Sequence, residues 1–327
     1  MPKGAQMSAK TVADASRFVI LPALFAVFVA ARILSRGSSI DHWLPEWWTF
    51  SILGTLMMLE RFYAYKYAVS QRPLLARDIL STLINVFVTG AVTGMIVFPV
   101  LAFFTEHFLG RKLVFASSGQ LGPFWVQVAA ILVGVSFFRY WMHRLQHKNE
   151  FLWKLHSYHH AVTDLQASNT FVSNPIDFAL RNVLVFVALG LIGFNPLAIL
   201  IAIPAVQVYG IFSHCGGDVR GGWLNYLFVT PEVHRWHHSA VVPEGHKYSV
   251  NYGVEFSFWD VAFGTYYLPL KDGQRQQPER LGHPGGMADE SNYLKLLLVP
   301  LGLYGIVPWL RRRLWIASDP EGPQPAE

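Results

Sequence analysis

The stretch from Arg139 to His160 reads RYWMHRLQHKNEFLWKLHSYHH, and it holds five of the thirteen histidines of the chain. These five are His143, His147, His156, His159 and His160. The first two stand four positions apart, and the last three have the spacing HxxHH. Because residues three and four positions apart are neighbours on an α-helix, each group directs its rings to one side. The pattern predicts helical segments that bring several imidazoles to a shared volume.

A third group, HRWHH, repeats the HxxHH spacing with His234, His237 and His238. Imidazole is the commonest neutral metal ligand near neutral pH. Eight rings exceed the four that a tetrahedral zinc site accepts, so they indicate two metals, or one metal with spare rings. The alternative is a set of core histidines that satisfy one another. It is disfavoured because several buried imidazoles without a metal would keep unpaired polar atoms.

The segments HRLQH, HSYHH and HRWHH resemble the three histidine boxes of the fatty acid hydroxylase and sterol desaturase superfamily. TPEVHRWHHS and NYGVEFSFWDVAFGTYYLP resemble its bacterial members and the alkylglycerol monooxygenase branch, and the resemblance runs from Phe137 to Pro269. It implies a membrane-bound non-haem di-iron oxygenase that uses dioxygen to hydroxylate or desaturate a lipid. It further implies that the eight box histidines hold two iron ions, and that an external ferredoxin- or cytochrome-like partner supplies electrons.

One segment departs from the resemblance. Many relatives carry an RxHPxE-like sequence after the second box, where this chain has NTFVSNPID at 169–177. The metal boxes are unaffected by this change, but the resemblance does not identify the lipid.

Composition places the chain in a membrane. Of its 327 residues 52% are hydrophobic and 14% are charged, whereas about a quarter of the residues of soluble proteins are charged. The net charge of +5 comes from basic residues beside apolar runs, which favours an anionic lipid surface over nucleic acid as the partner. Cys215 is the single cysteine, so no disulfide can form within the chain.

Apolar runs of roughly 20 residues, the length that crosses a bilayer, predict an all-α polytopic membrane protein. Four runs precede or reach the first histidine box, at 18–34, 47–58, 79–104 and 121–142. Two more, 177–193 and 196–213, form a helical hairpin that returns the chain to the side of the first two boxes. Basic residues in the 61–77 loop and after the fourth run place the N-terminus and the boxes on the cytoplasmic side. We expect a multi-pass protein of a bacterial inner membrane.

The expected organisation has three regions. Residues 1–142 form N-terminal transmembrane helices, and 143–270 form the histidine-box catalytic region with the hairpin 177–213. Residues 271–327 comprise a linker, a re-entrant or interfacial helix at 293–310 and a disordered tail.

A few residues outside the boxes are further candidates. His214, in FSHCGG, is either a ninth ligand or a helix-end histidine favoured by the helix dipole. Asp260 either orients a ring N–H from behind a ligand or caps a helix, and Asn251 either supports the ligands or forms a turn. Glu150 and Asp164, acids close to the first two boxes, are expected to be solvated or to cap helices.

Two other classes of function remain open. A zinc-dependent membrane hydrolase, or a membrane protein with a structural zinc, is the main alternative, but HxxHH lacks the glutamate that acts as general base in HExxH. A transporter with a histidine ion site is disfavoured because its ligands belong at mid-membrane, whereas these lie at the ends of the apolar runs.

Overall fold

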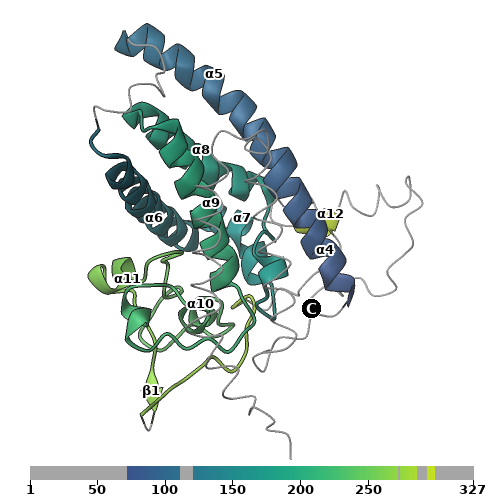
Figure 1. Cartoon of the computed structure of the whole chain (residues 1–327). Helices are drawn as coiled ribbons and strands as arrows, with labels where there is room; N and C mark the ends of the chain where they lie inside the picture. The colour runs from purple at the N-terminus through teal and green to yellow at the C-terminus, as the bar shows by residue number, and fades with distance from the viewer. Residues whose placement is uncertain (1–71, 111–120, 272, 286–292, 299–327) are drawn as a thin grey trace, which may run out of the picture.

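The computed structural model describes residues 72–110, 121–271, 273–285 and 293–298 (Figure 1). The expected spans at 18–34 and 47–58 lie outside the described residues, as do most of the helix expected at 293–310 and the tail that follows it.

Four helical segments of the described chain are long and apolar enough to cross a membrane. They are Ala76–Phe108, Phe124–Lys148, Pro175–Ile192 and Pro196–Ser213. The first joins α4 (Arg72–Thr82), the π-helical η2 (Leu83–Thr89) and α5 (Gly90–Leu109), and the others are α6 (Phe124–Lys148), α8 (Pro175–Ile192) and α9 (Pro196–Ser213). They match the runs expected at 79–104, 121–142, 177–193 and 196–213. The prediction of an all-α polytopic membrane protein is confirmed.

Shorter elements gather at one end of these helices. They are α7 (Glu150–His160), η3 (Ala167–Asn169), η4 (Gly222–Tyr226), α10 (Pro231–His237), α11 (Phe258–Ala262) and α12 (Tyr293–Leu298). The described strands, β1 (Leu270–Lys271) and β2 (Gln274–Arg275), form one small antiparallel pair. In Figure 1, α10, α11 and β1 lie below the long helices, beyond the ends of α6 and α9.

Successive long helices alternate in direction, so the two packed pairs, α6 with α9 and α5 with α8, each run parallel. The core between α6, α8 and α9 is aliphatic and includes Ile131, Val135, Leu189, Ala198 and Ala202. Outward-facing apolar side chains, such as Met95 and Phe103 on α5 and Trp125 on α6, are exposed. An apolar inner face and an apolar outer face are what a helix needs when its surroundings are lipid.

Three asparagines fix where helices begin near the site and at the hairpin turn. Asn149, Asn174 and Asn195 each accept a hydrogen bond from a backbone N–H in the first turn of α7, α8 and α9, respectively. Proline follows Asn174 and Asn195 at the first helical position, where its missing N–H has no cost. The extended backbone of Asn149 separates α6 from α7, so the second histidine box returns beside the first.

The first described span begins at the histidine end of the bundle. The side-chain amide of Asn85 donates to the carbonyls of Phe171 (2.9 Å) and Ser173 (3.0 Å). Ser168 donates to the carboxylate of Asp78 at 2.9 Å. These hydrogen bonds join the start of this span to the loop after the second histidine box. The segment that precedes residue 78 and the histidine boxes therefore share one end of the bundle.

The fold predicts opposite membrane sides for the loop before α6 and for the cap. Reporter enzymes fused after Gly122 and after Gly245 should report opposite sides, because the odd number of spans from α6 to α9 separates them. By the distribution of basic residues, the reporter after Gly245 should be cytoplasmic. A fusion after Phe194, in the α8–α9 turn, serves as control and should match the one after Gly122. Equal results for Gly122 and Gly245 would contradict this topology.

Candidate metal centre

Nine buried histidines converge at this end of the bundle, in two groups whose ligand atoms lie within 4.8 Å of one another. The first group takes two rings from α6, two from α7 and one from α10: His143, His147, His156, His160 and His237. The second takes its rings from α7, the end of α9 and α10: His159, His214, His234 and His238. The structure thus brings together all eight box histidines and His214.

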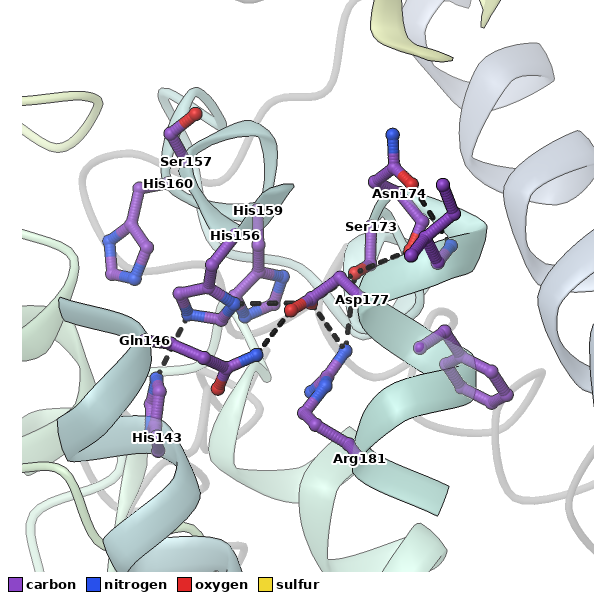
Figure 2. Close-up of polar contacts among 12 residues, drawn as sticks. His143, Gln146, His156, Ser157, His159, His160, Ser173, Asn174, Asp177 and Arg181 are labelled. Carbon is purple, nitrogen blue, oxygen red and sulfur yellow. Dashed lines mark hydrogen bonds and ion pairs between the residues drawn. The ribbon is translucent and has the colours of Figure 1, made fainter. Parts of the chain in front are cut away.

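Each HxxHH box is divided between the two groups. On α7, His156 and His160 belong to the first group, whereas His159 belongs to the second. Successive helical residues are rotated by about 100°, so adjacent rings must point in different directions. Figure 2 shows His159 and His160 diverging from the same turn. The expectation that each box presents one face is therefore wrong in detail, since one box contributes to two neighbouring sites.

The two groups are contiguous. The rings of His160 and His238 stack with their centroids 4.4 Å apart, and those of His156 and His159 are 5.3 Å apart. Two cations held in the two groups would be neighbours. Each group alone has enough imidazoles for one ion, as the two-metal interpretation requires.

Four rings are fixed from behind through Nδ1. The contacts join His143 to the carbonyl oxygen of Tyr252 (2.9 Å), His159 to that of Val172 (3.0 Å), His237 to that of Val250 (2.8 Å), and His156 to a carboxylate oxygen of Asp177 (3.2 Å). Each oxygen can only accept, so Nδ1 carries the proton in each neutral ring and Nε2 keeps its lone pair. Such backing is typical of histidines that bind metals through Nε2.

The inner nitrogens of the first group fit a cation. The Nε2 atoms of His143 and His156 are 3.1 Å apart. Because both rings carry their proton on Nδ1, two lone pairs face each other with no hydrogen between them. Two ligands that bind one metal at about 2.1 Å and at right angles are separated by about 3 Å. A metal ion would turn this repulsive contact into a pair of bonds.

Unpartnered nitrogens support the same conclusion. Nε2 of His147 and both ring nitrogens of His234 and His238 are buried without a hydrogen-bond partner in the described part of the chain. Buried polar atoms are almost always paired, so five such nitrogens in one volume require an explanation. Metal ions in the two groups supply it.

Burial keeps these rings in the neutral form that binds metals. It lowers the pKa of His159, His160, His234 and His238 well below 6.5, with the neighbouring imidazoles adding to the effect. Burial also lowers the pKa of His214 to about 3. Near neutral pH a metal need not displace a proton from any of these rings.

Asp177 is a site residue that the sequence analysis did not identify. In Figure 2 its carboxylate lies between His156 and the first turns of α8. It contacts Nδ1 of His156, accepts a hydrogen bond from Ser173 at 2.8 Å and another from Gln146, and pairs with Arg181 at 3.2 Å. One feature of the sequence could have identified it: Asp177 is an acid at the start of an apolar run. Ionisable residues in membrane spans are costly and usually functional.

Asp260 and Asn251 act through the backbone rather than on a ring. Asp260 accepts hydrogen bonds from the N–H groups of Tyr252 (2.6 Å) and Gly253 (2.8 Å), and so positions the carbonyl that backs His143. Burial raises the pKa of Asp260 to about 6. Asn251 has a left-handed backbone with φ of 55° and bonds the carbonyls of Val233 and Tyr267 through its side chain. Its side chain also accepts from the backbone N–H of Tyr267, and these bonds hold the loop that carries Val250 and Tyr252.

The remaining acids near the boxes lie outside the site. Glu150 is exposed in the first turn of α7, and Asp164 accepts a hydrogen bond from Gln166 at 2.5 Å. Two aromatic rings that the sequence analysis did not single out cover the first group. The centroids of Trp153 and Tyr252 lie 4.9 Å and 5.3 Å from that of His147.

Replacing Asp177 should weaken metal binding. In Asp177→Asn the charge behind His156 is lost, and the affinity for metal should fall by about 10- to 100-fold, as for other groups that orient a ligand from behind. Metal retained by the purified protein during dialysis against graded chelator measures this. Glu150→Gln, which removes an exposed carboxylate of α7, is the matched control. Retention equal to wild type in Asp177→Asn would contradict the assigned role.

His214 should be needed for the second group. His214→Ala leaves that group three imidazoles, so metal content should fall from about two ions per chain toward one, and His214→Gln should restore little because an amide is a poor substitute for imidazole. Elemental analysis of the purified variants measures the metal content per chain and so tests this role of His214. His246→Ala, in a loop beside Tyr267, is the control. Full metal content in His214→Ala would return His214 to the helix-end role.

Comparison with known proteins places this geometry in a family. Residues 128–265 match the family model described as fatty acid hydroxylase. An ornithine lipid hydroxylase, OlsE of Rhizobium tropici, is 39% identical over 148 residues, which are 45% of this chain and 44% of that protein. The human alkylglycerol monooxygenase is 30% identical over 151 residues, 43% of this chain and 31% of that protein.

A sterol desaturase of Gibberella zeae, Delta(7)-sterol 5(6)-desaturase ERG3B, is 25% identical over 174 residues, 53% of this chain and 52% of that protein. The matched segments span about half of the curated relatives or less. No solved structure matches the chain. The matched region contains all three histidine boxes and both groups of rings. Residues 128–265 therefore form a fatty acid hydroxylase domain, and the resemblance to the superfamily of fatty acid hydroxylases and sterol desaturases is supported.

Proposed function

We propose that this protein is a membrane-bound non-haem di-iron oxygenase that hydroxylates a lipid, with desaturation as the related outcome. The observation that carries the proposal is the pair of adjacent groups of five and four buried histidines at the end of the membrane-crossing helices. The relatives described above, a lipid hydroxylase, a monooxygenase and a desaturase, support oxidation of a lipid.

Two iron ions held by these groups would supply the dioxygen chemistry needed to attack an unactivated C–H bond. The chain's own residues provide the conditions for it. The oxygens behind Nδ1 hold the rings in place, so the ligand geometry is set before the metal arrives. Burial under Trp153 and Tyr252 keeps water from the first group.

Zinc-based hydrolysis is the less favoured function. A zinc hydrolase needs a carboxylate free to act as general base on a bound water. Among the described residues, Asp177 is the carboxylate that contacts a ring of the two groups, and it is occupied by His156, Ser173 and Arg181. A structural zinc would use four ligands, fewer than the nine histidines gathered here.

The substrate should reach the site from the bilayer, because the two groups lie where the spans end. Electrons should come from an external ferredoxin- or cytochrome-like donor. With the histidine end facing the cytoplasm of a bacterial inner membrane, as the basic residues favour, a soluble cytoplasmic donor could reach the cap.

Iron content and dioxygen uptake test this function. Protein purified from iron-replete cells should carry about two irons per chain, because each group offers enough imidazoles for one ion. With a chemical or protein reductant and membrane lipid extract, it should consume dioxygen and yield oxidised lipid detectable by mass spectrometry. A single tightly held zinc with no iron would overturn the proposal.

Three single substitutions serve as controls for that activity. His147→Ala, His159→Ala and His237→Ala should each abolish lipid oxidation, yet the proteins should still insert into the membrane because the apolar spans drive insertion. Membrane fractionation and lipid analysis of the same cells separate the two effects. Activity retained in one variant would remove that residue from the ligand set.

A further inference from the structure

A pocket lies between α6, α8 and α9, next to the metal centre. About 740 Å³ of space there is not filled by protein atoms, and this figure includes its open mouth. Much of its wall is apolar and suits a hydrocarbon chain: Val135, Phe178, Val185, Phe186, Ile203 and Val206.

The pocket lies on the membrane side of the histidines. Three of its residues stand four positions from a residue of the centre on the same helix: Arg139 from His143, Arg181 from Asp177, and Gly210 from His214. Four positions are about one helical turn, or about 5.4 Å along the axis. On all three helices this step leads from the histidine end toward the interior of the bundle. A lipid in the pocket would therefore end beside the metal centre.

Four polar side chains interrupt this apolar wall: Arg139, Arg181, Asn182 and Gln207. A pocket that bound only hydrocarbon would not need two arginines within membrane-crossing helices, because ionisable groups are costly there. Arg139 is neutralised by its ion pair with Glu255, which is buried. Arg181 is the cation whose pairing is incomplete.

Arg181 uses only part of its guanidinium on the protein. Its Nη2 contacts Asp177 and Ser173, each at 3.2 Å, while its Nε is buried with no hydrogen-bond partner among the described residues. Asp177 is shared further with His156 and Gln146, so it compensates the charge of Arg181 only in part. Figure 2 shows Arg181 directed at Asp177 from the following turn of α8.

Gln207 adds a second polar side chain to the pocket wall, from α9. No hydrogen bond joins its amide to the described part of the chain, so both its donor and its acceptor are available to a ligand. A guanidinium with unused donors favours carboxylate or phosphate, whose oxygens match its planar N–H groups.

We infer that this pocket binds a lipid bearing an oxyanion, a carboxylate or a phosphate, with Arg181 and Gln207 holding that group and the apolar wall holding the chain. The position of the bound lipid relative to iron rests on the proposed oxygenase function, whereas the binding itself does not. The carbons oxidised would then be those near the anionic group rather than the far end of a chain.

Equilibrium binding to the purified protein in nonionic detergent tests this inference. Three probes share one chain and differ in the head: hexadecanoate, hexadecyl phosphate and hexadecanol. Wild type should bind at least one of the two anions about tenfold more tightly than the alcohol, as expected for hydrogen bonds to charged groups. The preferred anion identifies the head group. Equal affinity for all three probes would contradict the inference that the pocket binds an oxyanion.

Variants then test which residue causes the preference for anionic probes. Arg181→Gln should lose it while binding hexadecanol as wild type does, and Arg181→Lys should recover part of it. Lys148→Gln, which removes an exposed cation at the same end of the bundle, should keep it. Metal content must stay at the wild-type value in Arg181→Gln, because Arg181 touches Asp177. An anion preference that survives in a metal-replete Arg181→Gln would refute the inference.

A second variant, Gln207→Leu, keeps the inference testable if Arg181→Gln misfolds. Gln207→Leu leaves the oxygens that back the histidines in place and should reduce the anion preference by about threefold, because an amide donates a stronger hydrogen bond to an anion than to an alcohol. If Arg181→Gln does not fold, an unchanged preference in Gln207→Leu counts against the site. None of these measurements needs dioxygen or turnover, so a protein that proved not to be an oxygenase would still give a clear answer.

Discussion

The structure depends on the contact between the inner nitrogens of neutral, buried imidazoles. Oxygens of the protein hold the protons of His143 and His156 on Nδ1, so their Nε2 lone pairs meet at 3.1 Å. The same separation joins Nε2 of His160 and His237. The contact between His143 and His156 is unfavourable in the metal-free protein, because both rings carry their proton on Nδ1. It is tolerated only if the surrounding helices hold the rings in place or a cation binds between them.

The scaffold provides that restraint through contacts distant in sequence. The carbonyls that back His143 and His237 belong to Tyr252 and Val250, which follow the hairpin and α10. Asp260 holds that loop through two backbone N–H groups, and Gly253 is required because an added Cβ would lie 2.5 Å from the carbonyl oxygen of Phe256. The centre is therefore complete only when the spans, α7 and the loop after α10 have all packed together.

Much of this could be predicted from the sequence. Apolar runs placed the four described spans, and regular histidine spacing identified all eight box residues, because both signals are local and periodic. The division of each HxxHH box between two groups was missed because it depends on where the other helices lie. Asp177 was missed for a similar reason: its role is set by His156, which stands in a different helix. The choice between the two roles of His214 needed the end of α9 in place.

Asp177 also explains why the metal centre and the pocket cannot be considered separately. One carboxylate oxygen faces Nδ1 of His156 and the guanidinium of Arg181, each at 3.2 Å. The position of this carboxylate therefore influences the orientation of one metal-facing ring and the charge left on one pocket cation. A carboxylate that served only the metal would need no arginine, and an arginine that served only as its counter-ion would leave no buried Nε unpaired. The first turns of α8 accordingly serve both sites, and a change in either one must act on the other through the same group.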